Sequence, residues 1–311
     1  MDQRSHTVRV YMVLALGIVG VSFSAILIRF ADAPASMIAF YRMFFASILT
    51  APYVAITQAK ALRKVSRSHF AYATASGFFL ALHFLAFIKS LELTTVASST
   101  VLVCMQPVFT MILGYLIFRE KISRVSAVGI GIALAGSVLM GLSDLLAGGN
   151  HLAGDLLALT GGLFASLYMI IGRKLRAQIP AASYCLMVYG TCAFLLLIVN
   201  VVAHVPLTGY GEGNYLLFFA LALVSTVGGH SIFNWALKHL EAVQVSTAFL
   251  GEPIGATILA LLLLREKPAV VQLVSGAIIL TGLYVFLQGS LKKSTHVLGS
   301  CPRKGLDNDT V

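Results

Sequence analysis

The sequence predicts an all-α polytopic membrane protein. Of its 311 residues, 58% are apolar and only 11% are charged, and the mean hydropathy is +0.90. A soluble protein carries about 25% charged residues, because most of its surface is wet. This composition excludes a soluble enzyme and a disordered chain. The apolar runs are long and unbroken, whereas a transmembrane barrel would alternate apolar and polar residues, so helices are expected.

Ten apolar segments are close to the length of about 20 residues that spans a membrane. We place the first five at roughly 10–30, 36–57, 69–91, 95–118 and 125–142. The second five are expected at roughly 154–172, 181–204, 214–237, 243–264 and 269–289. A polar cytoplasmic tail is expected over residues 291–311.

The basic residues are distributed unevenly between the connecting segments. Most Lys and Arg fall on one side if both termini are cytoplasmic, as the positive-inside rule requires. The acidic residues Asp32, Asp144, Asp155 and Glu212 then fall in outer loops. This bias explains the net charge of +10 without a nucleic-acid partner. The four cysteines lack metal-ligand spacing, and neither a metal nor a cofactor is expected.

The chain repeats itself after a shift of 146 residues, which places Pro34 on Pro180 and Pro107 on Pro253. The same shift places the charged tripeptide 119–121 on the identical tripeptide 265–267. We therefore divide the chain into five-span halves, residues 1–146 and 147–290. Because five is odd, the second half would cross the membrane upside down. Such inverted repeats are typical of secondary transporters.

Two repeat-related dipeptides near mid-membrane are the strongest site candidates, Gln106-Pro107 and Glu252-Pro253. Each proline removes one helical hydrogen bond, and interrupted helices are tolerated in the membrane where they line a cavity. Glu252 could carry a proton or face a cationic group of a substrate. Alternatively, it is a neutral hydrogen-bonding residue that helps the two halves pack.

Further candidates lie in other spans. His83 and His230 correspond to within one residue under the shift, and Asn234 follows His230 by one helical turn. Each histidine could titrate or orient a carboxylate, or simply be satisfied by a neighbouring helix. The expected cavity set is Ser24, His83, Gln106, Tyr168, His230, Asn234 and Glu252, with Glu252, His83 and His230 as candidates for proton coupling. Packing is an equally good explanation for Tyr168.

Arg42 and a row of glycines are interpreted as structural. Arg42 lies inside the second span, and we expect it to pair with Asp32 or with a carbonyl of a neighbouring helix. Gly129, Gly131, Gly136 and Gly141 in the fifth span would let helices approach closely. Internal packing is the favoured explanation, so the chain is expected to be a monomer or a homodimer.

These motifs together resemble the EamA-type ten-helix members of the drug/metabolite transporter superfamily. The resemblance rests on residues 40–46, on 106–121 and on 252–267, and it covers about residues 10–290. It implies transport of small metabolites, commonly amino acids and often as efflux. It also implies a central cavity lined by helices one, three, four, six, eight and nine. The family does not fix the substrate.

The sequence therefore predicts a secondary transporter in the bacterial inner membrane that alternates access around a mid-membrane site. Proton coupling is one option for its driving force. Uncoupled facilitated diffusion, import of a vitamin or nucleotide-like compound, and a receptor or scaffold role are the alternatives. The sequence carries no HExxH, GxSxG or P-loop motif, so an enzyme is not expected.

Overall fold

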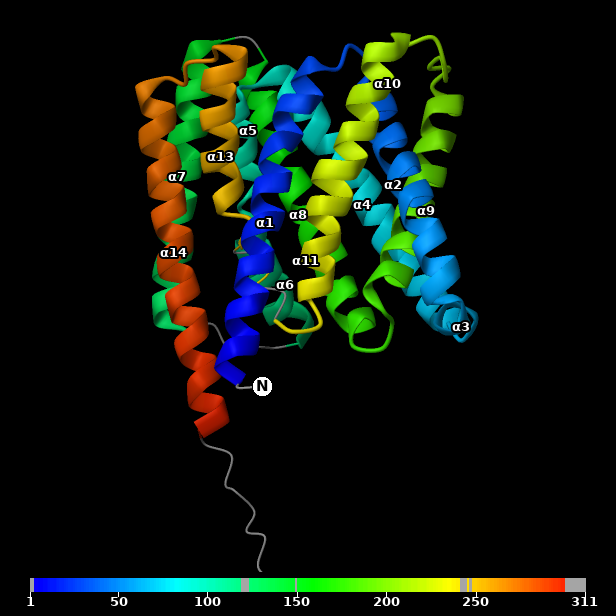
Figure 1. The fold of residues 1–311 in the computed structure, drawn as a ribbon. Coiled ribbons are helices and arrows are strands. Elements are labelled where there is room, and N and C mark those ends of the chain that lie inside the picture. Colours follow the sequence, from blue (N-terminus) through cyan, green and yellow to red (C-terminus); the bar gives the residue numbers. More distant parts are fainter. Residues whose placement is uncertain (1–2, 119–122, 149, 241–244, 246–247, 300–311) are drawn as a thin grey trace, which may run out of the picture.

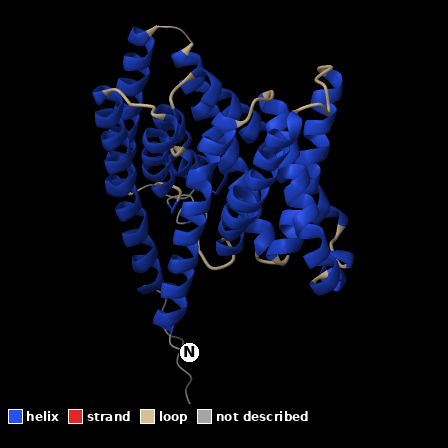
Figure 2. Ribbon diagram, turned by 45° about the horizontal axis from the view of Figure 1, so that its top comes forward, coloured by secondary structure: helices blue, strands red, loops and turns tan. Residues whose placement is uncertain are grey.

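The computed structural model describes residues 3–118, 123–148, 150–240, 245 and 248–299, and every regular element among them is a helix (Figure 1 and Figure 2). The first half contains α1 (Gln3–Phe30), α2 (Ala35–Thr57), the short α3 (Ala59–Arg63), α4 (Arg67–Leu93), α5 (Val96–Val103), α6 (Gln106–Phe118) and α7 (Arg124–Ala147). Next come α8 (His151–Arg176), α9 (Ala181–Val202), and α10 (Gly211–Ala220), which continues into the π-helix η1 (Leu221–His230) and α11 (Ser231–Ala236). The last elements are α13 (Gly251–Leu259), the π-helix η2 (Ala260–Leu264) and α14 (Val270–Gly299).

The described part of the chain contains nine helices that are long and apolar enough to cross a membrane, and one shorter apolar helix, Gly251–Leu264. The predicted all-helical membrane fold is confirmed. The shorter helix belongs to the ninth predicted segment, whose first residues lie largely outside the described part. The inverted orientation of the halves and the cytoplasmic location of the termini stay predictions.

Both ends of the bundle's chain lie on one side, since α1 begins and α14 ends at the bottom of Figure 1. We call this the terminal side and the opposite side the far side. Helix α14 continues to Gly299, so the first part of the predicted tail, residues 291–299, belongs to this helix. The first copy of the repeated charged tripeptide, residues 119–121, lies outside the described residues.

Helices of one half pack mainly against helices of the other. The largest contacts join α7 with α14, α4 with α8, α2 with α9, and α1 with η1. In the ten-span numbering these are spans 5 with 10, 3 with 6, 2 with 7, and 1 with 8. If each span is replaced by its counterpart in the other half, the same four pairs are obtained. Large apolar side chains such as Leu16 and Val138 remain exposed on the outside, where lipid is their favourable environment.

Two of the four glycines in α7 explain its contact with α14. A Cβ atom on Gly129 would lie 2.6 Å from the Gly282 carbonyl oxygen, and one on Gly136 would lie 2.8 Å from the Ile279 side chain. Such distances show that the two backbones almost touch. In contrast, a Cβ atom on Gly131 would meet nothing within 4 Å. The expectation of close internal packing is therefore met at two of these positions.

Two spans are interrupted near their middle, as the prolines predict. Helix α5 ends at Val103, Cys104 and Met105 form a turn, and α6 restarts at Gln106 with Pro107 next. Helix α13 starts at Gly251, two residues before Pro253. Proline is tolerated in a first helical turn because the N–H that it lacks has no helical acceptor there.

We predict that Gly129→Ala lowers the free energy of unfolding by about 1–3 kcal/mol, because the added methyl overpacks the contact with α14. Gly131→Ala is the matched control on the same helix. It should be neutral or stabilising by up to about 1 kcal/mol, because alanine favours helix more than glycine does. Thermal unfolding of the purified protein in detergent measures both. Equal destabilisation by the two substitutions would contradict the packing account.

Candidate functional site

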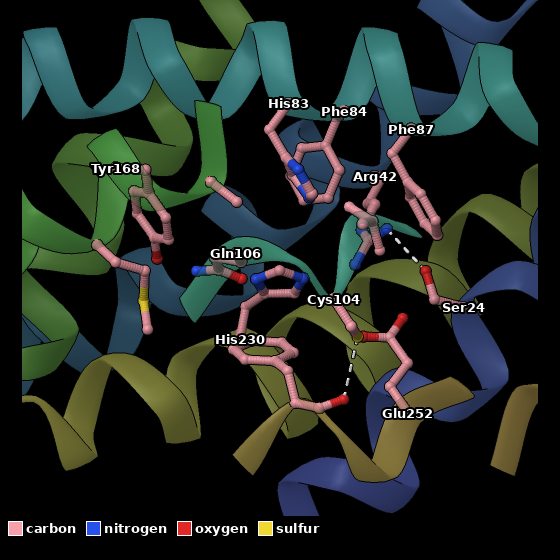
Figure 3. Close-up of a pocket in the computed structure, with 14 residues that line it drawn as sticks. Ser24, Arg42, His83, Phe84, Phe87, Cys104, Gln106, Tyr168, His230 and Glu252 are labelled. Atoms are coloured by element: carbon pink, nitrogen blue, oxygen red, sulfur yellow. Dashed lines mark hydrogen bonds between the residues drawn. The ribbon is translucent and has the colours of Figure 1, made fainter. Parts of the chain in front are cut away.

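A cavity of about 30 Å³ lies in the middle of the bundle, at the level of the two helix interruptions (Figure 3). Its lining comes from both halves of the chain. The lining residues are Ser24, Arg42, His83, Phe84, Phe87, Val103, Cys104, Gln106, Ala165, Tyr168, Met169, His230, Phe249 and Glu252. A volume of this size holds one or two water molecules, so the cavity is contracted in this conformation.

The structure brings six of the seven predicted cavity residues together around this space: Ser24, His83, Gln106, Tyr168, His230 and Glu252. Their role in binding stays a prediction. The exception is Asn234, which is fully buried behind the cavity wall. Its Oδ1 accepts a 2.6 Å hydrogen bond from the Tyr168 hydroxyl. Asn234 thus positions Tyr168 in this conformation, and its predicted part in the substrate cavity stays a prediction.

Arg42 of α2 also lines the cavity, and its surroundings differ from those expected. The side chain is fully buried. Its Nε donates to Thr226 Oγ1 at 2.8 Å and its Nη1 donates to Ser24 Oγ at 2.9 Å, where Asp32 or a backbone carbonyl was expected. Its guanidinium carbon lies 4.3 Å from the centre of the Phe84 ring, a cation–π contact. The remaining nitrogen, Nη2, is buried without a partner among the described residues.

The π-helical stretch η1 helps to hold Arg42. A π-helix carries one extra residue per turn and is common at functional sites. Thr226 lies within η1 and faces Arg42, while its own hydroxyl also reaches the Leu221 carbonyl five residues earlier, at 3.2 Å. Sequence reasoning missed this π-helix, because its residues are as apolar as those of an ordinary span.

Glu252 enters the cavity from the first turn of α13. It is 7% exposed, and in the described part of the chain it forms no ion pair with Arg42 within 4.0 Å. The two helix interruptions meet next to it, where the Cys104 thiol donates to the Phe249 carbonyl at 3.3 Å. The carbonyl of Gln106 is likewise satisfied, by the Ser166 hydroxyl at 2.9 Å. Two backbone carbonyls beside the interruptions, those of Gln106 and Phe249, therefore have side-chain donors.

The two histidines face each other across the cavity, with ring centres 6.3 Å apart. His83 Nδ1 lies 3.0 Å from the Gly161 carbonyl oxygen. A carbonyl can only accept, so this nitrogen carries the hydrogen, and in the neutral ring Nε2 is left as an acceptor. His230 packs between the Phe84 and Phe249 rings. The apolar lining gave no signal in the sequence, because nearly every span carries such residues.

The profile of the EamA-like transporter family matches residues 8–142 and 152–288 of the chain. The chain belongs to the EamA-like transporter family. Its geometry agrees with this assignment, since the spans surround a cavity lined by both matched regions.

Individual relatives are named as transporters, and a solved structure has a similar fold. A Clostridium kluyveri protein named an uncharacterized transporter is 31% identical over 56% of this chain and 58% of its own length, so the match spans well under two thirds of that relative. A Salmonella typhimurium protein named a probable amino-acid metabolite efflux pump is 27% identical over 62% of this chain and 68% of its own length. A crystal structure of a protein at 17% identity covers 92% of this chain and 99% of the solved chain with a TM-score of 0.66. That likeness supports the fold alone.

This EamA-like chain is therefore a member of a transporter family and an integral membrane protein. Family membership implies a small-molecule substrate and a lipid environment, and it argues against an enzyme.

We predict that Tyr168→Phe lowers the free energy of unfolding by about 1–3 kcal/mol, because Asn234 Oδ1 would lose its donor inside the bundle. Tyr115→Phe is the matched control, since Tyr115 is 50% exposed and should be insensitive. Chemical or thermal unfolding of the purified protein measures both variants. An unchanged stability of Tyr168→Phe would contradict the positioning role of Asn234.

Proposed function

We propose that this transporter is a secondary active exporter of amino acids or similarly small polar metabolites that works by alternating access. The observation that carries the proposal is the pair of opposite charges in one cavity. Arg42 offers a buried nitrogen without a partner, and Glu252 offers a carboxyl group without an ion pair among the described residues.

An amino acid fits this arrangement chemically. Its carboxylate can accept a charge-assisted hydrogen bond from Arg42 Nη2, and its ammonium group can face Glu252. Such bonds are about twice as strong as neutral ones. The charges of Arg42 and Glu252 and the two charges of the amino acid would then be paired, whereas unpaired buried charges are costly. The aromatic and aliphatic lining, with Phe84, Phe87 and Met169, would contact the remainder of the solute.

Substrate binding requires the cavity to enlarge, because about 30 Å³ has no room for an amino acid. The packing of each half against the other offers a route, since the proposed inverted halves 1–146 and 147–290 can rock around the site. Two conformations of similar energy, biased by the substrate or a proton, are sufficient for alternating access. The names of the Salmonella typhimurium and Escherichia coli relatives, probable amino-acid metabolite efflux pumps, support the substrate class and the direction.

Proton coupling is part of the proposal, with Glu252 as the first candidate and with His83 and His230 as the others. Glu252→Gln keeps the size of the side chain and removes its ability to ionise. We expect gradient-driven transport to be lost, and substrate exchange to be weakened because the ammonium group loses its ionic partner. The measurement is uptake and counterflow of radiolabelled amino acids in proteoliposomes with and without a pH gradient.

Glu212→Gln is the matched control for this experiment, because Glu212 is exposed in the first turn of α10. Full gradient-driven transport by Glu252→Gln would reject Glu252 as the coupling residue. Flux without counterflow in the wild-type protein would instead favour an uncoupled facilitator.

The histidines are tested by ligand binding rather than by transport. We expect an amino acid to raise the melting temperature of the purified wild-type protein in a panel that also includes vitamins and nucleotides. The apparent affinity obtained from these shifts should fall at least tenfold in His83→Ala and in His230→Ala, because both rings line the cavity. His69→Ala, a half-buried residue in the first turn of α4 far from the cavity lining, is the control. Equal shifts in all variants would place the ligand elsewhere.

A further inference from the structure

A second polar cluster is buried on the far side, away from the central cavity. It is formed by Thr94 after α4, Ser98 of α5, Asp144 of α7, Asp155 of α8 and Gln272 of α14. Both aspartates are only 2% exposed. This corrects the expectation that they lie in outer loops: α7 and α8 extend further than their apolar segments, and both carboxyl groups turn inward.

Hydrogen bonds distinguish the two aspartates. Asp144 receives donors on both oxygens: Ser98 Oγ donates to Oδ2 at 2.8 Å and Gln272 Nε2 donates to Oδ1 at 2.8 Å. The Gln272 amide is fixed in this orientation because its oxygen accepts from the Ala269 N–H at 3.0 Å. Asp155, in contrast, touches Thr94 through Oδ1, and its Oδ2 is buried without a partner among the described residues.

Thr94 has one hydroxyl hydrogen and two carboxyl neighbours. Its Oγ1 lies 3.3 Å from Asp144 Oδ2 and 3.0 Å from Asp155 Oδ1. Thr94 can donate its hydrogen to only one of these two oxygens. The contact with the second carboxyl group is a hydrogen bond only if that carboxyl group is protonated and donates to Thr94. Asp144 is already solvated as an anion by two donors. The hydrogen therefore belongs on Asp155, whose unpartnered oxygen costs far less as a neutral carbonyl than as part of a carboxylate.

No salt bridge in the described part of the chain supplies a cation to Asp155. Asp144 on α7 is acidic, and Arg29 is held through Thr94 and Glu266. On α8 itself, His151 lies one turn earlier with its Nδ1 buried and without a partner in the described part, and on α4 Lys89 and Glu92 pair with each other in an exposed position. The facing residues of α5 and α14 are the neutral Ser98 and Gln272.

Thr94 also connects this cluster to contacts that join three elements on the far side. Its carbonyl accepts from Arg29 Nη2 of α1 at 3.3 Å. The same Nη2 binds Glu266 Oε2 at 3.1 Å, and Glu266 Oε1 accepts from the Val96 N–H, the first residue of α5, at 2.7 Å. We call Arg29, Thr94, Val96 and Glu266 the far-side closure. It gives the second copy of the repeated tripeptide, residues 265–267, a role that the central cavity does not explain.

We propose that Asp155 is a proton-binding site whose occupancy holds the far-side closure together. With the proton bound, Asp155 donates to Thr94 and Thr94 donates to Asp144, so Thr94 bridges α7 and α8. When the O–H bond of Asp155 breaks and the proton passes to water, two facing carboxylates remain with one donor fewer. Thr94 then loses one of its two anchors, and its contact with Arg29 loosens. The link to transport rests on the proposed alternating access, but the proton site can be tested without any substrate.

Two measurements on the full-length protein in detergent test this inference. Infrared difference spectra report protonated carboxyl groups through their C=O stretch. We expect a buried-acid band in the wild type that is absent in Asp155→Asn and present in Asp32→Asn, the exposed far-side control. Recording the same spectra in a Glu252→Gln background separates Asp155 from the central carboxyl group. An acid band that survives in Asp155→Asn in that background would overturn the proposal.

Amide hydrogen exchange at Val96 reports the closure, because Glu266 is the acceptor of this N–H. Asp155→Asn stays neutral at every pH, so its Val96 amide should remain protected at high pH. At the same high pH, the Val96 amide of the wild type should exchange at least tenfold faster. Identical protection of the two proteins at every pH, or protection that follows sodium concentration instead of pH, would overturn the proposal. If Asp155→Asn does not fold, Thr94→Val decides: the acid band should stay while the pH dependence of Val96 protection is lost.

Discussion

Burial of the Arg42 guanidinium is the constraint on which the rest of the site depends. A charge at this depth is expensive unless the surrounding helices supply partners. The hydroxyl groups of Ser24 and Thr226 and the ring of Phe84 do so from three other helices. These contacts join the first half of the chain to η1 in the second. One nitrogen of Arg42 remains without a partner among the described residues, and we propose that this unmet donor binds an anionic group of the substrate.

The interrupted spans serve the same site from the opposite side. In each half a proline lies in the first turn of the helix that starts in mid-membrane, and the turns before these helices meet where the Cys104 thiol reaches the Phe249 carbonyl. Every irregular backbone segment in a membrane must face protein or a cavity. The break before α13 thus presents Glu252 to the cavity that Arg42 also lines.

Much of this arrangement could be predicted from the sequence, because charges and prolines are conspicuous in apolar spans. The spans, the interruptions and six residues around the cavity followed from those signals. The position of Arg42, Asn234 and Asp155 did not. Which face of a helix a residue occupies depends on how the helix is rotated and where it ends, and the π-helical stretch in η1 changes that rotation by one residue. Spans that are apolar on every face have no hydrophobic periodicity, so the rotation of a helix cannot be predicted from its sequence.

Selective binding of a zwitterion is the central claim, and equilibrium binding tests it most directly. The probe is a radiolabelled neutral amino acid on the purified protein, competed by the corresponding amine without its carboxylate and by the corresponding acid without its amino group. The account predicts that only the intact amino acid competes at comparable concentration, and that binding is lost in Arg42→Met. Equal competition by either analogue, or unchanged binding by Arg42→Met, would contradict it.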